Sequence, residues 1–397
     1  AFQGLNPTQF GQKLNQVLQV LHDWHVTIRL PDGTYLGYQA DYPRNYSTKL
    51  FLNYTTSGQG YQNVRNANVI YHAGLKGNWA HIQVDTFATD AFAKISDADL
   101  DDVFAQYAAV DGWILDIRAN NGGDETQGRK IASRFTDRSL TYGHVRLRKA
   151  GTLPYEFEPE IVKALEPAAA GQRRTQPVAV LVGQRCMSSA EWFTLMMRAC
   201  PNAILIGDRT RGASGGPALG TVEGWDLEYS VSTWIAYDEN HQPFEDRGIP
   251  PALAVPPGAS VDEAAQRDYV LEKAITYLEW RKNLGSRLPL VSARTDADRD
   301  GRLDVIEFAE GTDPLVGGTT STFGFEPGGI QMSPFGGIDL RWRSVAGATY
   351  TVERADRVTG PWARIAKSIS ATPPVNTYAD TSATGRGPYF YRLVREP

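Results

Sequence analysis

The central part of the chain alternates between short, continuously apolar runs and stretches whose apolar residues recur at helical spacing. The apolar runs predict buried strands at residues 79–87, 112–117, 177–183 and 203–207. The amphipathic stretches predict helices at residues 97–109, 126–135, 188–198 and 261–284. Continuous apolar strands that alternate with helices are typical of a parallel sheet covered on both faces. We therefore predict an α/β core over residues 78–285.

The N-terminal residues 1–77 follow another pattern, which predicts a helix followed by a β-rich cap region. Apolar residues recur at helical spacing over residues 7–21, where Asn6 or Thr8 could cap the helix. Residues 26–30 then alternate between apolar and polar side chains, which predicts a strand.

The composition changes again after the core. Residues 286–317 form a charged linker, and residues 318–397 contain alternating segments such as 338–342 and 350–354, separated by Gly and Pro turns. This pattern predicts a small C-terminal all-β sandwich.

Charge and hydropathy exclude two classes of partner. The net charge is −5, from 40 basic and 45 acidic residues that are well mixed along the chain. Because no basic face or run stands out, we expect no nucleic-acid partner. No apolar stretch approaches the length that spans a bilayer, so we expect no membrane span.

The chain has two cysteines, Cys186 and Cys200, which form neither a disulfide framework nor a zinc motif. A predicted helix of about ten residues, roughly 15 Å long, lies between them. A disulfide across that length would be strained or impossible, and we expect two free thiols.

Residues 296–307 read D-A-D-R-D-G-R-L-D-V-I-E, which matches a calcium-binding loop. Calcium prefers six to eight oxygen ligands. These would come from the side chains of Asp296, Asp298, Asp300, Asp304 and Glu307 and the backbone carbonyl of Arg302, with Gly301 at the sharp turn. We expect a structural Ca²⁺ that stiffens the linker.

Ser188 follows a predicted buried strand and opens a predicted helix. At that place a serine hydroxyl lies beside free backbone N–H groups and the positive end of the helix dipole, which can stabilise an oxyanion. The alternative is structural: Ser188 could cap the helix, with Glu191 completing a capping box. The motif alone leaves both interpretations open.

Gly122 and Gly123 end the sequence L-D-I-R-A-N-N-G-G, in which a strand runs into a turn before a helix. Glycines allow a backbone to approach a ligand closely and to present free N–H groups. A plain strand-to-helix turn is the alternative interpretation.

Taken together, these motifs resemble the tail-specific, or C-terminal processing, serine peptidase family over residues 8–280. The motifs occur in the family's order: L-D-I-R-A-N-N-G-G, an apolar strand, S-S-A-E, L-I-G-D-R-T-R-G-A-S-G and E-D-R-G-I-P-P. The resemblance implies a ClpP/crotonase-like core and a peptide or unfolded protein as substrate. It also implies that Ser188 is the nucleophile, with an oxyanion hole formed by the N–H groups of Ser189 and of Gly122 or Gly123.

The resemblance also bears on the general base. The Ser-Lys members carry a T-x-G-K-G motif, but this chain reads T-R-G-A-S at residues 210–214, without lysine. The sequence L-H-D-W-H at residues 21–25 instead resembles the branch of the tricorn core protease and the interphotoreceptor retinoid-binding protein. That likeness implies His25 as general base and Glu245 as the carboxylate that orients it.

Some assignments around His25 stay open. Tricorn has a serine directly before this histidine, whereas this chain has Trp24, so Asp23 is an alternative to Glu245 for orienting His25. His22 is the alternative general base. The other histidines match none of these motifs, and we expect no catalytic role for them; they are His72, His81, His144 and His241.

The remaining segments resemble accessory modules of exported bacterial proteins. Residues 296–314 are similar to thrombospondin type 3 calcium linkers, and residues 318–397 to fibronectin type III modules. We therefore expect an extracellular or periplasmic protein. No PDZ-like insertion is visible between residues 35 and 78.

Three functions are compatible with these features. The first is a Ser-His peptidase, for which an intact set of Ser188, His25, Glu245 and the glycine pair would be needed. The second is a ligand-binding protein on the same fold, which would not need that set. The third is an adhesion protein, which would expose an aromatic patch on the C-terminal module. The sequence does not indicate the oligomeric state.

Overall fold

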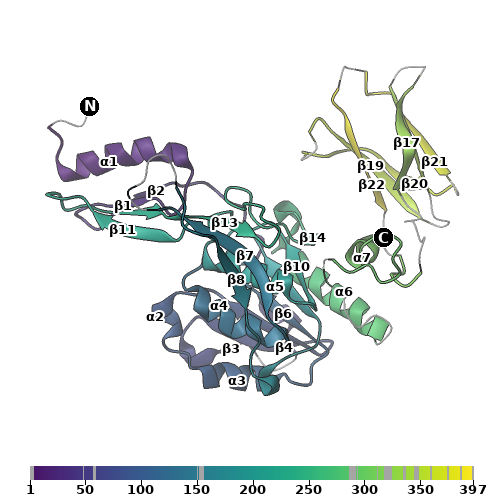
Figure 1. Cartoon of the computed structure of the whole chain (residues 1–397). Helices are drawn as coiled ribbons and strands as arrows, with labels where there is room; N and C mark the ends of the chain where they lie inside the picture. Colours follow the sequence, from purple (N-terminus) through teal and green to yellow (C-terminus); the bar gives the residue numbers. More distant parts are fainter. Residues whose placement is uncertain are drawn as a thin grey trace. The chain divides into compact units, whose positions relative to one another are not determined.

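The computed structural model divides into two compact units, Ala1–Thr295 with Leu303–Val305, and Asp296–Arg302 with Ile306–Pro397, and each is described separately (Figure 1). The residues that the structure describes are 4–47, 49–56, 60–149, 151, 156–285, 292, 294–310, 312–316, 324–333, 337–343, 348–357, 360–372, 375–384 and 387–395.

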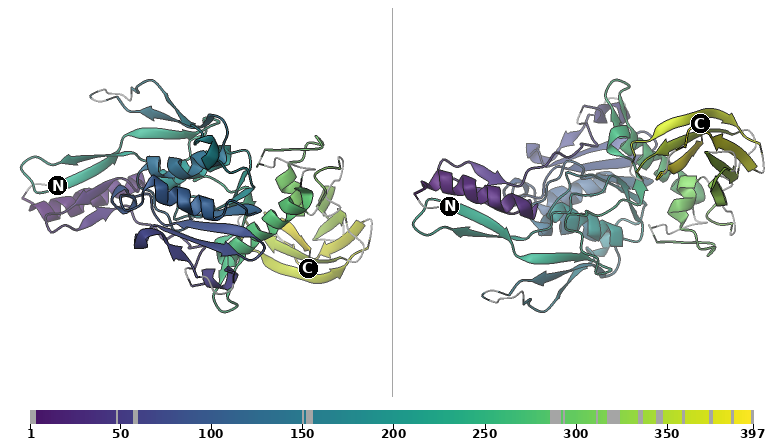
Figure 2. Two further views of the ribbon diagram at one scale, coloured as in Figure 1. Left: turned by 90° about the horizontal axis from the view of Figure 1, so that it is seen from below. Right: turned by 90° about the horizontal axis from the view of Figure 1, so that it is seen from above.

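The first unit begins with a helix that lies along a small antiparallel sheet (Figures 1 and 2). The predicted N-terminal helix is confirmed as α1 (Pro7–Leu18), which Asn6 caps in a capping box, followed by the 3-10 turn η1 (Gln19–Leu21). The sheet has the order β11 (Pro217–Thr221), β12 (Glu228–Ser232), β1 (Thr27–Arg29) and β2 (Tyr35–Gly37). Apolar residues of α1 such as Phe10 and Leu14 pack against Ile28, Leu30 and Leu227.

A seven-stranded mixed sheet forms the centre of the first unit. The predicted apolar runs are confirmed as four of its strands, and these pair in parallel with one another. The order across the sheet is β14 (Leu253–Ala254), β10 (Ala203–Gly207), β9 (Val178–Val182), β6 (Gly112–Asp116), β5 (Trp79–Val84), β4 (Ile70–Leu75) and β3 (Gln62–Asn63).

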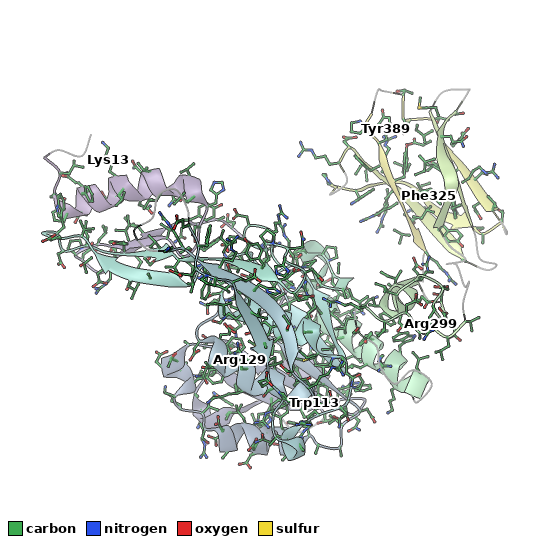
Figure 3. The ribbon with its side chains drawn as sticks, in the orientation of Figure 1. Lys13, Trp113, Arg129, Arg299, Phe325 and Tyr389 are labelled. Atoms are coloured by element: carbon green, nitrogen blue, oxygen red, sulfur yellow. The ribbon has the colours of Figure 1, made fainter. Side chains whose placement is uncertain are left out.

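Helices cover both faces of this sheet. Strand β9 is buried throughout, and its alternate residues face the two sides of the sheet. On one side, Val178, Val180 and Val182 pack in the core with the apolar residues of α5 (Ser189–Ala199). Trp113 on β6, labelled in Figure 3, is fully buried in the same core. The further helices and turns of this unit are α2 (Thr89–Phe92), α3 (Asp97–Gln106), α4 (Glu125–Ala132), α6 (Tyr269–Leu284), η2 (Phe51–Tyr54), η3 (Val64–Asn66), η4 (Ser133–Phe135), η5 (Ala170–Gln172) and η6 (Pro257–Ala259).

A separate antiparallel sheet packs on α5. Its strand order is β13 (Trp234–Asp238), β7 (Leu140–Leu147) and β8 (Ile161–Leu165).

The prediction of one helix over residues 261–284 is wrong in its first third. There the chain forms a two-stranded ribbon, β15 (Val261–Asp262) and β16 (Arg267–Asp268), and α6 begins only at Tyr269. Asp268 caps the helix through Leu271 N–H and also pairs with the buried Arg118 at 2.8 Å. The helix therefore starts where a long-range ion pair fixes its cap, which local periodicity does not reveal.

The second unit contains two antiparallel three-stranded sheets. One has the order β17 (Gly324–Met332), β18 (Ile338–Arg343) and β21 (Val375–Asp380); the other has β20 (Ala363–Ser370), β19 (Thr349–Ala355) and β22 (Phe390–Arg395). Trp342 and Tyr350, from different sheets, are fully buried in one core, against which Phe325 and Tyr389 pack (Figure 3). The short helix α7 (Asp304–Glu310) precedes these strands.

Two further expectations can be compared with the structure. Cys186 and Cys200 are both buried free thiols, which confirms the prediction of no disulfide between them. Among the described residues, no helix combines the length and apolarity needed to cross a membrane.

Candidate active site

Ser188 lies in a sharp turn between β9 and α5, at the carboxyl end of the central parallel strands. Its backbone has φ 54° and ψ −126°, a conformation that L-residues rarely adopt. Such a residue costs about 1–3 kcal/mol, and this kind of strain is common at functional sites. The Ser188 side chain makes no capping hydrogen bond, so the helix-cap interpretation does not describe this serine.

Glu191 does not complete a capping box either. Its buried carboxylate accepts hydrogen bonds from Thr210 Oγ1 at 2.6 Å and from the N–H groups of Gly212 and Ala213 at 2.7 Å. Burial raises the pKa of Glu191 to about 7, because desolvation outweighs these hydrogen bonds. Glu191 therefore fixes the loop after β10 against the start of α5.

The glycine pair lies directly against the serine turn. A Cβ atom added to Gly122 would come within 2.7 Å of the Met187 carbonyl oxygen and 2.8 Å of Ser188 Cβ. Gly122 also has φ +100°, so both space and backbone conformation favour glycine here. The turn at Gly122 and Gly123 can therefore pack against Ser188, because these two residues have no side chains.

The two glycines differ in their free donors. The N–H of Gly122 donates to the buried Asn120 Oδ1 at 2.8 Å and is therefore already used. In the part of the chain that the structure describes, the N–H groups of Gly123 and Ser189 donate no hydrogen bond. Ser189 Oγ donates to the Gly123 carbonyl at 2.6 Å and joins the two segments. Of the two glycines considered from the sequence, Gly123 has the available donor.

His25 is buried between η1 and β1, with 9% of its surface exposed. Its backbone N–H donates to Asp23 Oδ1 at 2.8 Å, and its carbonyl accepts from Ser230 Oγ at 2.6 Å. Asp23 Oδ1 also lies 4.0 Å from the ring atom Nδ1 of His25. None of the described residues forms a hydrogen bond with this Nδ1. Gly215 packs so closely on this ring that an added Cβ would collide with it.

Glu245 is bonded to Ser214 rather than to His25. Its Oε2 accepts from the Ser214 N–H at 2.9 Å and from Ser214 Oγ at 2.6 Å. The sequence did not single out Ser214, because nothing local distinguishes it from other loop serines. Asp23 raises the pKa of Glu245 electrostatically, after the larger effect of burial, so both carboxylates considered for orienting His25 lie in the same region.

One short segment connects the candidate nucleophile, base and acid. The carbonyl oxygen of Ala213 accepts a hydrogen bond from the Ser188 N–H at 2.7 Å. The next residue, Ser214, donates to Glu245, and Gly215 packs on the His25 ring. Among the described residues, no hydrogen bond joins Ser188 Oγ to the His25 ring. Catalytic hydrogen bonds often tighten only when substrate is bound, so this arrangement is compatible with a Ser-His pair.

Burial sets the protonation of the base. It lowers the pKa of His25 below the ordinary value of 6.5, and the negative charge of Asp23 opposes this shift. The imidazole is therefore neutral at neutral pH and able to accept a proton.

Trp24, the residue before His25, contacts an arginine. The Trp24 ring packs on the Arg211 guanidinium at 4.1 Å, and Tyr42 packs on it at 3.8 Å. These side chains line a cleft of about 360 Å³ together with His22, which is exposed and stacks on Tyr38. His22 therefore belongs to the wall of this cleft.

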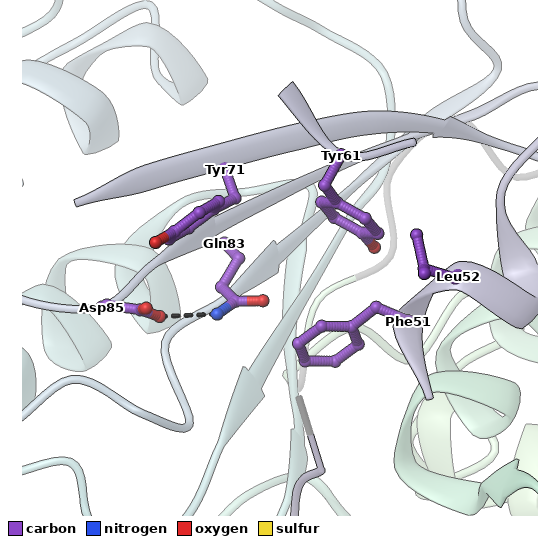
Figure 4. A pocket seen from close by; sticks show the side chains of 6 residues that line it. All are labelled: Phe51, Leu52, Tyr61, Tyr71, Gln83 and Asp85. Atoms are coloured by element: carbon purple, nitrogen blue, oxygen red, sulfur yellow. Dashed lines mark hydrogen bonds between the residues drawn. The ribbon is translucent and has the colours of Figure 1, made fainter. Parts of the chain in front are cut away.

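A second pocket, of about 330 Å³, lies over strands β4 and β5 (Figure 4). Aromatic side chains form much of its wall, and Gln83 donates to Asp85 at 2.6 Å. Its lining residues are Phe51, Leu52, Tyr61, Tyr71, Gln83 and Asp85. Burial raises the pKa of Asp85, which adds a weakly acidic group to an aromatic pocket.

Residues Asp296–Arg302 of the predicted calcium loop form a compact acidic turn in the second unit. Carboxylate oxygens of Asp296, Asp298 and Asp300 lie within 4.8 Å of one another. Gly301, with φ +91°, donates its N–H to Asp296 at 2.9 Å. Asp296 Oδ1 and Asp298 Oδ2 are buried without a hydrogen-bond partner, which fits a cation. The later residues Asp304 and Glu307 are fully buried.

The central part of the chain is similar to a known peptidase family. Residues 78–255 match the model of peptidase family S41. The chain is 25% identical over 191 residues to the carboxy-terminal processing protease CtpA of Bacillus subtilis (strain 168), an alignment that covers 46% of this chain and 36% of CtpA. This chain thus spans about a third of the length of that relative.

Solved structures are also similar to parts of this chain. A candidate peptidase from Parabacteroides merdae ATCC 43184 has 26% sequence identity and a TM-score of 0.59, covering 69% of this chain and 84% of that chain. The tricorn protease is also similar, with 16% identity and a TM-score of 0.38 over 52% of this chain and 18% of its own, too little to support an argument. Residues 78–255 are thus similar to peptidase family S41, and the first unit that contains them has a mixed α/β fold.

Proposed function

We propose that this protein is a serine peptidase that cleaves peptides or unfolded proteins through an acyl-enzyme on Ser188. The observation that carries the proposal is the Ser188 turn, which holds a strained serine without a capping bond. Among the described residues, the N–H groups of the adjacent Ser189 and of Gly123 donate no hydrogen bond. The family match of the surrounding segment supports the same chemistry.

In this mechanism the neutral His25 accepts the proton of Ser188 Oγ while that oxygen attacks the substrate carbonyl carbon. The N–H groups of Ser189 and Gly123 stabilise the resulting oxyanion. The intermediate then breaks the C–N bond, and protonated His25 gives its proton to the leaving amine. A water molecule hydrolyses the acyl-enzyme by the same route, which returns Ser188 and His25 to their starting states.

The proposal includes an orienting group for His25. The family resemblance favours Glu245, which accepts a hydrogen bond from Ser214. The alternative is Asp23, whose Oδ1 lies 4.0 Å from His25 Nδ1. Either would stabilise the protonated imidazole electrostatically. The core itself is proposed to be of the ClpP/crotonase type.

The accessory segments complete the proposal. Ca²⁺ binds the loop at residues 296–307 and stiffens the linker to a fibronectin type III-like module, in a protein exported from a bacterial cell. The unpaired buried oxygens of Asp296 and Asp298 support the calcium site. Calcium here has a structural role and takes no part in the reaction.

Degradation of an unfolded protein tests the proposed activity. The purified full chain is incubated with reduced, carboxymethylated casein in calcium-containing buffer, and peptide release is followed by mass spectrometry. We expect cleavage by the wild type and by the surface variant Ser139→Ala, and none by Ser188→Ala. Equal cleavage by Ser188→Ala would contradict the assignment of the nucleophile. Absence of cleavage by every form would favour the ligand-binding alternative.

A further inference from the structure

Three side chains outside the candidate active site meet on the small β13-β7-β8 sheet. His144 lies on β7, opposite Tyr237 of β13 and Val162 of β8. Glu160 directly precedes β8, and His241 lies in the turn after β13. Three segments that are well separated in the sequence therefore each contribute one metal-binding type of side chain.

The ligand atoms of these residues converge. Glu160 Oε1 lies 3.0 Å from His144 Nδ1 and 3.1 Å from His241 Nε2. The two imidazole rings stack with centroids 3.8 Å apart and an interplanar angle of 27°. All three ligand atoms lie within 4.8 Å of one another.

The burial of His144 is a second observation that favours a bound cation at this cluster. Its side chain is nine-tenths buried, and none of the described residues gives its Nδ1 a well-directed hydrogen bond, although Glu160 Oε1 is only 3.0 Å away. The contact has the distance of a hydrogen bond without its direction. A buried polar atom without a well-directed partner is unfavourable, and a bound cation at this place would satisfy it.

The surroundings leave Glu160 as the available carboxylate. Asp238 and Glu239, in the same turn as His241, are both paired with Arg198, at 2.9 Å and 2.5 Å. Side-chain exposures of 33% for Glu160 and 57% for His241 provide a path for an ion to enter.

We propose that His144, Glu160 and His241 form a binding site for a divalent transition metal of the zinc type. Two imidazole nitrogens and one carboxylate oxygen are a common three-ligand set for zinc, with bonds of about 2.0–2.2 Å. Tetrahedral coordination at those lengths separates the ligand atoms by roughly 3.3 Å, so the two measured separations need little adjustment.

The site would leave a fourth coordination position for water or for a ligand from outside the chain. Binding would also tie the start of β8 and the turn after β13 to β7. The proposal is independent of the proposed peptidase activity, because none of its residues belongs to the Ser188 site.

Zinc binding by the full chain tests the proposal. The metal-free protein is dialysed against zinc in excess Ca²⁺, which occupies the acidic loop at residues 296–307, and bound metal is measured by inductively coupled plasma mass spectrometry. Co²⁺ then replaces zinc, so that its visible absorption reports nitrogen ligands and a low coordination number. We expect one zinc per chain and an intense Co²⁺ band.

Variants at the two exposed ligands identify the site without disturbing the core. Removing a group that only supports a metal ligand lowers metal affinity by about 10- to 100-fold. His241→Asn and Glu160→Gln remove ligands themselves, so each should lower zinc affinity by at least about 10- to 100-fold. His22→Asn is the matched control, because His22 is also exposed and left-handed, with φ 51° against 57° for His241. Wild-type protein without bound zinc, or zinc binding equally weakened by His22→Asn, would overturn the proposal.

Discussion

The backbone N–H of Ser188 donates a hydrogen bond to the carbonyl oxygen of Ala213, 2.7 Å away. Ala213 therefore holds the serine turn through its backbone carbonyl and not through its side chain. The next two residues hold Glu245 and cover His25. The segment 213–215 therefore fixes the serine turn relative to the candidate base and acid.

Replacing Gly215 should displace the base. A methyl group at this position collides with the His25 ring, and Gly215 has φ +42°, so Gly215→Ala must move one of the two segments. Because displacements of about 1 Å can cost about 100-fold in rate, we expect kcat/KM to fall by at least that factor. Gly33→Ala is the matched control, since Gly33 also has positive φ but an added Cβ meets nothing within 4 Å. Unchanged kcat/KM in Gly215→Ala would contradict the role of His25.

Ser214 and Glu245 should act as a unit. If Glu245 orients His25 through Ser214, then Ser214→Ala and Glu245→Gln each lower kcat by about 10- to 100-fold, and the double variant loses no more than the more damaging single variant. Kinetics with a fluorogenic peptide, with melting temperatures as a folding control, provide the cycle. Fully additive losses would show that the two residues act separately. Asp23→Asn is measured in parallel, and a larger loss there would make Asp23 the orienting carboxylate.

The pH dependence should reflect the burial of His25. Burial lowers its pKa below 6.5, so the acidic limb of kcat/KM should have an apparent pKa below 6.5. Asp23→Asn removes a charge that raises this pKa and should move the limb to still lower pH. The lowered pKa also makes the free energy of unfolding depend on pH. The contribution of His25 to that free energy is fully present above pH 6.5 and is lost as the pH falls through the folded-state pKa. An apparent pKa above 6.5 for the acidic limb, or a shift of that limb to higher pH in Asp23→Asn, would contradict this prediction.

Calcium should protect the linker. In the Ser188→Ala background, which removes self-cleavage, chelation should increase trypsin cleavage within residues 296–307 and lower the melting temperature of the full chain. Asp296→Asn with Asp298→Asn should reproduce this effect in the presence of Ca²⁺. Digestion patterns that are the same with calcium, magnesium or chelator would show that the loop does not bind calcium.

Much of the core could be predicted because its signal is local. Strands such as β9 are buried on both faces and therefore read as continuous apolar runs. The turn at Ser188 could also be located, because a buried apolar strand is followed there, after only a few residues, by an amphipathic helix.

The finer arrangement could not be predicted, because it depends on contacts between distant segments. Asp268 starts α6 where it meets Arg118, 150 residues away in sequence. The Ser214–Glu245 hydrogen bond and the stacking of His144 on His241 likewise join segments that are far apart in the sequence. Local hydrophobic periodicity carries no information about such pairs, so two histidines without a motif could not be recognised as neighbours.

Labelling with a fluorophosphonate probe tests the central claim most directly. The folded full chain is treated with the probe at neutral pH in the presence of Ca²⁺, and the adduct is located by peptide mass spectrometry. The account predicts a covalent adduct on Ser188 that is absent in Ser188→Ala and strongly reduced in His25→Ala. A folded wild-type protein that acquires no adduct on Ser188, or that is labelled equally well without His25, would contradict it.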